Sequence, residues 1–384
     1  MDPIRVLVVS SIVPNALGSG GELVLHRCLE LNPRIECEVV RWQRFPFRLK
    51  VIGKLREIGL RSLSQTWECL FPVLPTDKMV HDLIHSFRPH VLVTVAHGWW
   101  HIKARRVAKQ FELPLVSLFQ DWWPDFPEIP FAFRSRVERE FHQTCAESDV
   151  VVCVSGGMCR ELGQPQNAFV VHDAPCLARR REGKCDFKPP MRLAYFGNLS
   201  DYGPLIENAL RALKSSEQVR LEVFGPSPFW TSGVEDEFRS RGVYHGFAPS
   251  NKLMESLQRY QAVLVVMSFA PSHRRRMTTS FPSKMIDAMQ LGLPVVIWGP
   301  EYCSAVKWAR SGERALCVTD PNPSAIRRAL EQLAASPAEQ ERLAESSREA
   351  AETDFNHERI QAQFIDTLRR AIEVNRAGLT HARR

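Results

Sequence analysis

The sequence predicts an α/β protein of two doubly wound domains, each built on a parallel sheet. Short apolar runs rich in β-branched residues alternate with segments of helical periodicity along the 384 residues. Such runs suit strands buried on both faces of a parallel sheet, and their alternation with helices indicates βαβ units. A chain of this length leaves room for two or three domains. We expect strands at Leu7 to Val9, Val91 to Val95, Leu115 to Phe119 and Val150 to Val154, and then at Leu193 to Phe196, Leu221 to Phe224, Ala262 to Met267 and Pro294 to Ile297.

A stretch without periodicity separates the two groups of strands. It contains the basic cluster Arg179 to Arg181 and ends on Pro189-Pro190, a composition typical of a linker. Near the C-terminus, four apolar residues follow one another at a spacing of four, which predicts a helix with one buried face: Ile360, Phe364, Leu368 and Ile372. We therefore expect an N-terminal domain at 1–175, a linker at 176–190, a C-terminal domain at 191–350 and a final helix at 351–384.

Composition excludes several classes of protein. With 44% hydrophobic and 24% charged residues, the chain is neither wholly disordered nor fibrous. The formal charge of +7 is compatible with anionic substrates or an anionic membrane surface, but no nucleic-acid module accompanies it. None of the ten cysteines forms a C-x-x-C pair, so we expect reduced thiols and no structural zinc. No cleavable leader or membrane span is recognisable, which favours a cytoplasmic protein.

Two loops have the composition of anion-binding turns. Gly18 to Glu22 follows the first strand and precedes a helix running through Leu31, and helix starts offer unpaired N–H groups to anions. It does not fit the dinucleotide pattern G-x-G-x-x-G, because Leu23 stands at the third glycine, so a tight turn without a ligand remains open.

The second loop lies within Thr278 to Val296 and predicts a loop, a helix, a glycine stop and a buried strand. Ser283 would cap the helix and Gly292 would end it. Lys284 would face a phosphate at the helix start. Asp287, one turn further on, would bind ribose hydroxyls or only complement the helix dipole.

Residues 278–296 resemble the donor-binding signature of retaining GT-B glycosyltransferases of family 4. Other segments match this family in the right order over roughly residues 1–335. They are Gly20-Gly21-Glu22, His97-Gly98, Gln120 to Pro124, Val154-Ser155 with Met158, Tyr195 to Leu199, and Gly246-Phe247.

The resemblance implies two Rossmann-like domains of the GT-B fold facing a cleft, with a C-terminal helix crossing back to the first domain. It implies a nucleoside-diphosphate-sugar donor, no cofactor, no metal and retention of anomeric configuration. His97 and Asp121 would be catalytic. Gly20, Gly21 and Trp122 would lie on the acceptor side. The donor would contact Gly197, Asn198, Gly225, Phe247, Arg275, Ser283, Lys284 and Asp287.

Four positions depart from the family pattern. Asn198 and Gly203 stand where an arginine and a lysine are usual, Thr279 replaces the first glutamate, and Gln120 replaces a histidine. A diphosphate still requires positive charge, which Lys284 and the triplet Arg274 to Arg276 would supply. The alternatives are a solvated, mobile loop for the triplet and a catalytically inactive relative for the chain.

Residues 41–61 interleave seven basic residues with apolar ones, against a single acid, Glu57. This composition suits a segment lying on an anionic membrane, or an ordinary exposed helix. The pairs Trp99-Trp100 and Trp122-Trp123 follow predicted strands, and their rings would pack on sugars or in the core.

We therefore expect a glycosyltransferase that moves a sugar from a nucleoside-diphosphate sugar to a saccharide or lipid-linked acceptor in cell-surface glycan biosynthesis. It would be cytoplasmic, at the inner face of the plasma membrane, with no nucleic-acid partner. The alternatives are a non-catalytic binding protein or partner subunit, a sugar-nucleotide epimerase and a nicotinamide oxidoreductase.

Overall fold

The computed structural model describes residues 2–18, 20–42, 46–176, 189–226 and 228–382. Its contacts divide the chain into two compact units. Unit 1 comprises residues 1–172 and 360–384, and unit 2 comprises residues 173–359. The expected linker at 176–190, with Arg179 to Arg181, lies almost wholly outside the described residues, as do Arg44 and Phe45 of the basic segment.

Unit 1 contains a six-stranded sheet in the order β2-β1-β3-β4-β5-β6, with every neighbouring pair parallel. Parallel neighbours require crossover connections, which are helical here. The strands are β1 (Ile4–Val8), β2 (Ile35–Val39), β3 (Val91–Val95), β4 (Leu115–Phe119), β5 (Val150–Cys153) and β6 (Ala168–Val170).

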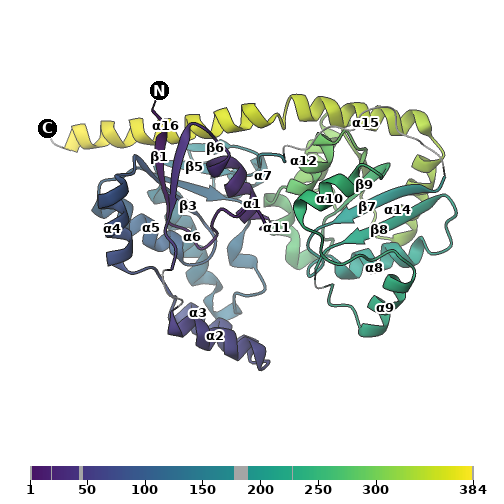
Figure 1. The fold of residues 1–384 in the computed structure, drawn as a ribbon, viewed down its shortest axis with the longest axis horizontal. Helices are drawn as coiled ribbons and strands as arrows, with labels where there is room; N and C mark the ends of the chain where they lie inside the picture. Colours follow the sequence, from purple (N-terminus) through teal and green to yellow (C-terminus); the bar gives the residue numbers. More distant parts are fainter. Residues whose placement is uncertain (1, 19, 43–45, 177–188, 227, 383–384) are drawn as a thin grey trace. The chain divides into compact units, whose positions relative to one another are not determined.

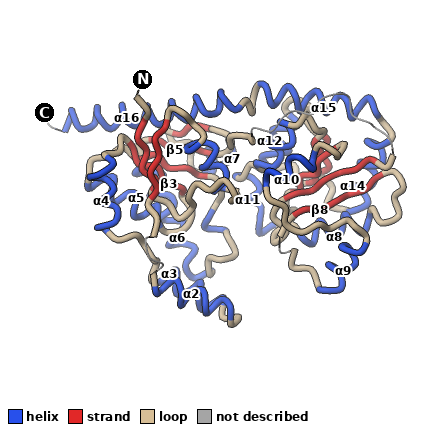
Figure 2. The backbone as a smooth tube through the Cα atoms, in the orientation of Figure 1, coloured by secondary structure: helices blue, strands red, loops and turns tan. Residues whose placement is uncertain are grey.

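Helices cover both faces of this sheet, as Figures 1 and 2 show. One buried cluster joins β1 and β3 to α4 and α5, and another joins β4 and β5 to α6 and α7. The helices are α1 (Gly21–Leu25), η1 (His26–Glu30), α2 (Phe47–Glu57), α3 (Arg61–Leu70), α4 (Asp77–Phe87), α5 (Trp100–Gln110), η2 (Trp123–Asp125), η3 (Phe131–Phe133), α6 (Arg134–Glu147), α7 (Gly156–Glu161) and the greater part of α16 (His357–Ala382).

Unit 2 contains a five-stranded parallel sheet in the order β11-β10-β9-β7-β8. Its strands are β7 (Met191–Phe196), β8 (Val219–Phe224), β9 (Ala262–Val266), β10 (Val295–Trp298) and β11 (Leu316–Val318). Its helices are α8 (Gly203–Ala212), α9 (Ser232–Ser240), α10 (Ser250–Leu257), η4 (Pro271–His273), α11 (Arg274–Thr279), α12 (Ser283–Gln290), α13 (Ser304–Arg310), α14 (Pro323–Ala334) and α15 (Pro337–Glu352).

All eight strands expected from the sequence are present, with bounds shifted by at most three residues. The sequence missed β2, β6 and β11, which are outermost strands of their sheets. These three strands lack a long run buried on both faces: β2 carries exposed Glu36 and Glu38 between half-buried residues, and β6 and β11 have only three residues each. The continuous apolar run that identifies a central strand is therefore missing from them.

The C-terminal stripe is confirmed as the buried face of α16. Ile360, Phe364 and Leu368 are buried, and Ile372 is half-buried. The side chain of Gln361 donates to the carbonyl oxygens of Arg27 and Leu31, within unit 1. In the described part of the chain, no helix is long and apolar enough to cross a membrane.

Candidate functional site

The carboxyl ends of β7 and β8 in unit 2 bring Gly197 and Gly225 into contact. The Gly197 N–H donates to Phe224 O (2.9 Å), and a Cβ on Gly225 would lie 2.1 Å from Gly197 O. A side chain at Gly225 would therefore collide with the backbone of Gly197. In doubly wound sheets, ligands bind at this edge, and the two glycines keep its backbone accessible.

Two buried tyrosines fix these glycine turns. Tyr195 donates through its hydroxyl to Asn198 O (2.6 Å), and Tyr244 donates to Gly225 O (2.9 Å). Burial raises the pKa of Tyr195, so its hydroxyl keeps the proton that it donates. From the sequence, Tyr195 belonged only to a segment that resembles the family, and Tyr244 was not singled out. For Tyr195, a hydroxyl-bearing ring within a buried strand is the signal that could have indicated a role in holding a neighbouring loop.

Lys284 reaches from the start of α12 to the turn after β7. A Cβ built on Gly197 would lie 2.1 Å from Lys284 Cε and 2.8 Å from its Nζ. Gly197 also has a φ of +142°, a conformation that favours glycine. The missing side chain is therefore what allows the lysine to cross this turn. The structure brings Gly197, Gly225 and Lys284 together at one edge of unit 2.

Helix α12 confirms the expected helix, glycine stop and strand. Its N-cap is Pro282, so Ser283 is the first helical residue and not the cap that we expected. No side chain caps this helix start. Gly292 follows the helix with a φ of +68°, as a helix-ending glycine does.

Asp287 is buried, and its Oδ1 accepts a hydrogen bond from the backbone N–H of Cys176 (2.9 Å). This carboxylate oxygen holds the chain at Cys176, a structural role that the sequence did not suggest. Asn198 is also engaged locally, because its Oδ1 accepts from the backbone N–H (2.8 Å) and the hydroxyl (2.7 Å) of Ser200.

The arginine triplet forms the first turn of α11, so the alternative of a mobile loop is wrong. Arg276 is buried and forms an ion pair with Asp201 (2.8 Å), in the loop that follows β7. Arg274 stacks on the ring of Tyr302 at 4.2 Å. Arg275, the residue expected to bind the donor, lies between these two arginines in the sequence, and its side chain is half-buried. The ion pair therefore fastens α11 to the turn region that contains Gly197.

Two departures from the family pattern have structural explanations. At Gly203, a Cβ would lie 2.4 Å from Pro228 O, so a lysine fits there only if the backbone moves. Thr279 is wholly buried, and its hydroxyl donates to Arg275 O (3.0 Å), which closes the end of α11.

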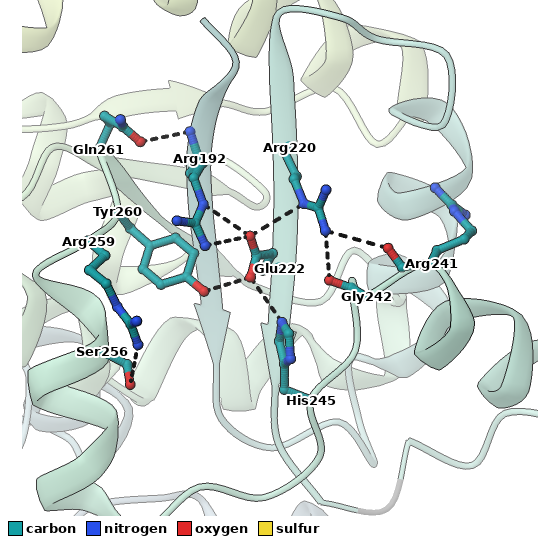
Figure 3. A network of polar contacts seen from close by, with 10 residues as sticks. All are labelled: Arg192, Arg220, Glu222, Arg241, Gly242, His245, Ser256, Arg259, Tyr260 and Gln261. Atoms are coloured by element: carbon teal, nitrogen blue, oxygen red, sulfur yellow. Dashed lines mark hydrogen bonds and ion pairs between the residues drawn. The ribbon is translucent and has the colours of Figure 1, made fainter. Parts of the chain in front are cut away.

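A polar network centred on Glu222, within strand β8, lies in unit 2 (Figure 3). The buried carboxylate accepts from Arg192 (2.9 Å) and from the hydroxyl of Tyr260 (2.8 Å), and it contacts His245 Nε2 (2.9 Å). Burial alone would raise the pKa of Glu222, but the hydrogen bonds from Tyr260 and Arg192 outweigh it and hold that pKa below its ordinary value. The network fixes His245, whose ring stacks on Phe224, and thereby the chain leading to exposed Phe247.

In unit 1, the carboxyl ends of β1, β3 and β4 bring together the expected acceptor-side loops. The Ser11 hydroxyl donates to His97 O (2.6 Å). A Cβ on Gly21 would lie 2.6 Å from Gln120 Oε1, so the loop after β1 touches the residue after β4. Gly20, with a φ of +53°, is the N-cap residue of α1. Because β1, β3 and β4 are neighbours, Gly20, Gly21, His97 and Asp121 share one sheet edge.

The tryptophans are core residues. Trp122 is 1% exposed and packs against Phe141 at a ring distance of 5.0 Å, so no open indole face marks it as an acceptor contact. Trp99, Trp100 and Trp123 are buried as well. The ring of His97 lies 6.0 Å from that of Trp123 and 5.1 Å from that of Phe126. Of the tryptophans, Trp123 therefore packs near the His97 ring.

His101, four residues after His97 and in α5, is wholly buried. Its Nδ1 lies 2.6 Å from the hydroxyl of Thr144, and that hydroxyl donates to Glu140 O (2.9 Å). Thr144 therefore accepts from His101, which places the ring proton on Nδ1. Burial lowers the pKa of His101 to about 3, so the ring is neutral. Among the described residues, no three His, Cys, Asp or Glu side chains gather as metal ligands would.

Comparisons with known proteins show similarity at the level of the fold. No family model matches the sequence. No curated protein sequence matches it. HepE of Anabaena, solved with UDP, superposes with a TM-score of 0.64 at 14% identity over 95% of this chain and 99% of HepE. A glycosyltransferase of Rickettsia africae gives 0.63 at 10% identity over 97% and 99%.

A variant of S. aureus TarM, solved with fondaparinux, alpha-GlcNAc-glycerol and UDP, gives a TM-score of 0.52 at 10% identity. The match covers 72% of this chain and 55% of TarM, so the chain spans about half of that protein. At these identities the likeness shows the fold. The expected fold class, a GT-B protein with two Rossmann-like parallel sheets, is confirmed.

Proposed function

We propose that this protein is a glycosyltransferase that moves a sugar from a nucleoside-diphosphate sugar to a saccharide or lipid-linked acceptor. The shared fold supports this proposal, since HepE was solved with UDP-glucose and TarM with UDP. We extend it to a UDP-sugar as the first donor to test. Membership of family 4, retention of configuration and a role in cell-surface glycan synthesis at the cytoplasmic membrane face belong to the same proposal.

The observation that carries the proposal is the position of Lys284 across Gly197. A leaving nucleoside diphosphate gathers negative charge, and preorganised cations and N–H groups stabilise it. The Lys284 ammonium and the first-turn N–H groups of α12 supply both at the carboxyl edge of the unit 2 sheet. Arg275, on the helix fastened to the same region, would add a second cation. With these cations the proposal requires no metal.

The remaining donor contacts follow from the same edge. Gly197 and Gly225 would offer their accessible backbone to the diphosphate, Asn198 and Ser283 would flank it, and exposed Phe247 would offer a ring to the base or sugar. Asp287 would contact the ribose while holding Cys176.

In unit 1, the edge with Gly20 and Gly21 would take the acceptor, with His97 and Asp121 as the catalytic candidates. The bond from the anomeric carbon to the diphosphate oxygen breaks, the acceptor hydroxyl oxygen forms the new bond, and the hydroxyl proton leaves. A histidine or a carboxylate is a suitable group to receive that proton.

The test is a panel of nucleotide sugars measured by thermal shift and calorimetry on the full chain. A donor at about 100 times its dissociation constant adds about 2.7 kcal/mol of stability. Lys284→Ala should lose about half of this shift or more, because its dissociation constant should weaken by a factor of about 10 to 150. Lys307→Ala, an exposed lysine of the same unit, should retain the shift. If Lys284→Ala binds as the wild type does, the donor-site assignment is wrong.

Turnover separates the functional classes. A transferase releases diphosphate from the bound sugar nucleotide when acceptor is added. Binding without release would indicate a non-catalytic binding protein, and an altered sugar nucleotide without acceptor would indicate an epimerase.

A further inference from the structure

Helix α3 turns its apolar residues outward. Leu63, Trp67 and Leu70 follow one another at spacings of four and three, which places them on one helix face. Their exposed fractions are 52%, 41% and 48%. Leu60 and Phe71, also exposed, extend this face at both ends, and together the five residues form what we call the α3 stripe. The buried positions of the helix are Ser64 and Cys69, so its amphipathic pattern is directed away from the core.

This orientation is fixed by contacts on the other side of α3. Cys69 belongs to a buried core cluster of unit 1, and its carbonyl oxygen accepts from Arg136 Nη1 (2.8 Å). Arg56 of α2 forms an ion pair with Glu68 of α3 (2.6 Å). The helix cannot turn the stripe inward without breaking these contacts. The exposure of the stripe is therefore a property of the folded unit.

Positive charge predominates in the segment that contains α2 and the stripe. Residues 46–71 contain five cations, Arg48, Lys50, Lys54, Arg56 and Arg61, and two acids, Glu57 and Glu68. Because Arg56 and Glu68 pair with each other, the remaining charge is three cations in excess. All five cations are exposed, and so are Phe47 and Ile58 at the two ends of α2.

We propose that the α3 stripe docks on an anionic lipid bilayer, with the cations of α2 held at the lipid headgroups. Apolar side chains that include a tryptophan enter the interface, and lysine and arginine remain at the charged surface. A protein partner would need an apolar surface of matching shape, whereas a bilayer needs only the charge and the exposed apolar side chains that the structure presents.

Helices α2 and α3 form a helical hairpin next to the sheet edge that holds the proposed acceptor loops. α2 and α3 follow the carboxyl end of β2, and they pack against each other beyond the sheet of unit 1 (Figure 1). The loops with Gly21, His97 and Asp121 follow the carboxyl ends of β1, β3 and β4 in the same parallel sheet. If the proposed function holds, the docked hairpin brings the acceptor edge toward the bilayer, which suits a lipid-linked acceptor.

The experiment is co-sedimentation of the full chain with phosphatidylcholine vesicles that contain or lack phosphatidylglycerol. We expect binding only to the anionic vesicles. Lys50→Gln with Lys54→Gln should weaken it about 25-fold, about fivefold for each cation. Leu63→Ser with Trp67→Ser should weaken it at least about tenfold. The matched controls, Lys109→Gln and Phe229→Ser, alter an exposed cation and an exposed ring elsewhere and should bind as the wild type does.

Insertion is read separately with brominated phosphatidylglycerol, which quenches a tryptophan that enters the bilayer. Trp67→Phe should still bind but lose the quenched component. Equal binding to both kinds of vesicle, or unchanged binding of the stripe and charge variants, would overturn the proposal. The proposal would also be overturned if the wild-type chain did not bind vesicles and instead self-associated through the stripe. Thermal shift with a UDP-sugar is measured on the same variants, so loss of docking is distinguished from loss of the proposed donor site.

Discussion

Replacing Gly197 by alanine tests the contact on which the donor site rests. The new Cβ would lie 2.1 Å from Lys284 Cε, far inside van der Waals distance, so the lysine must leave the turn. The displaced atoms are the flexible end of a long side chain, and the helix need not move. The remaining cost is the backbone at a φ of +142°, about 1–3 kcal/mol for a residue other than glycine.

The assay is a double-mutant cycle of Gly197→Ala and Lys284→Ala, read by calorimetry with the UDP-sugar that the panel selects. Losing a hydrogen bond to a charged group costs about 1.5–3 kcal/mol, a factor of about 10 to 150 in dissociation constant. Each single variant should lose about this much, because both remove the ammonium from the turn. The double variant should bind no worse than either, which gives a coupling energy of similar size.

Stability provides a second readout that needs no ligand. Gly197→Ala should cost less unfolding free energy in the Lys284→Ala background, since the collision is then absent. Strictly additive binding losses, together with an equal stability cost in both backgrounds, would refute the role given to this contact.

Three further predictions concern buried groups. Glu222→Gln should lower the free energy of unfolding by about 2 kcal/mol at pH 7, measured by chemical denaturation. This is less than the cost of breaking a fully buried pair, because Arg192 is partly exposed and solvent screens the interaction. Because the folded-state pKa of Glu222 is lowered, this gap should close as pH falls below the ordinary glutamate range. The lowered pKa of His101 also makes the folded state less stable in acid. Below about pH 6.5 the unfolded chain binds a proton on this histidine, but the folded chain does not. Wild-type stability should therefore fall with acid by up to about 1.4 kcal/mol per pH unit more steeply than that of His101→Leu. Asp287→Asn should cost about 1–2 kcal/mol, since the amide oxygen is a weaker acceptor for the Cys176 N–H.

Each of these has an outcome that would contradict it. A Glu222→Gln gap that stays constant down to pH 3 would mean that another group sets the acid dependence. Parallel pH profiles for His101→Leu and wild type would show that His101 titrates normally. An Asp287→Asn variant of unchanged stability would remove the anchoring role of that carboxylate.

The sequence predicts the central strands well because a strand buried on both faces has a continuous run of apolar residues. The predicted bounds agree with the structure at both ends for two central strands, Val91 to Val95 and Leu115 to Phe119. Strand β2 pairs with one neighbouring strand and has exposed glutamates, so it lacks such a run. Likewise, the loop at 278–296 was recognisable because a helix start, a lysine and a helix-ending glycine are local features.

Other functional assignments depended on contacts between distant residues. The sequence could not show that Lys284 crosses Gly197, that Asp287 holds Cys176, or that Trp122 is sealed in the core. Each of these depends on which elements the sheets bring together, and residue spacing along the chain carries no information about it.

The sequence by itself determined two parallel α/β sheets and the turns at their carboxyl ends, because hydrophobic periodicity and glycine positions are local properties. Only the tertiary structure decided how each polar side chain is used. The α3 stripe illustrates the difference: its periodicity predicts an amphipathic helix, but whether that face meets the core or solvent depends on the contacts of Cys69 and Glu68 on the other side.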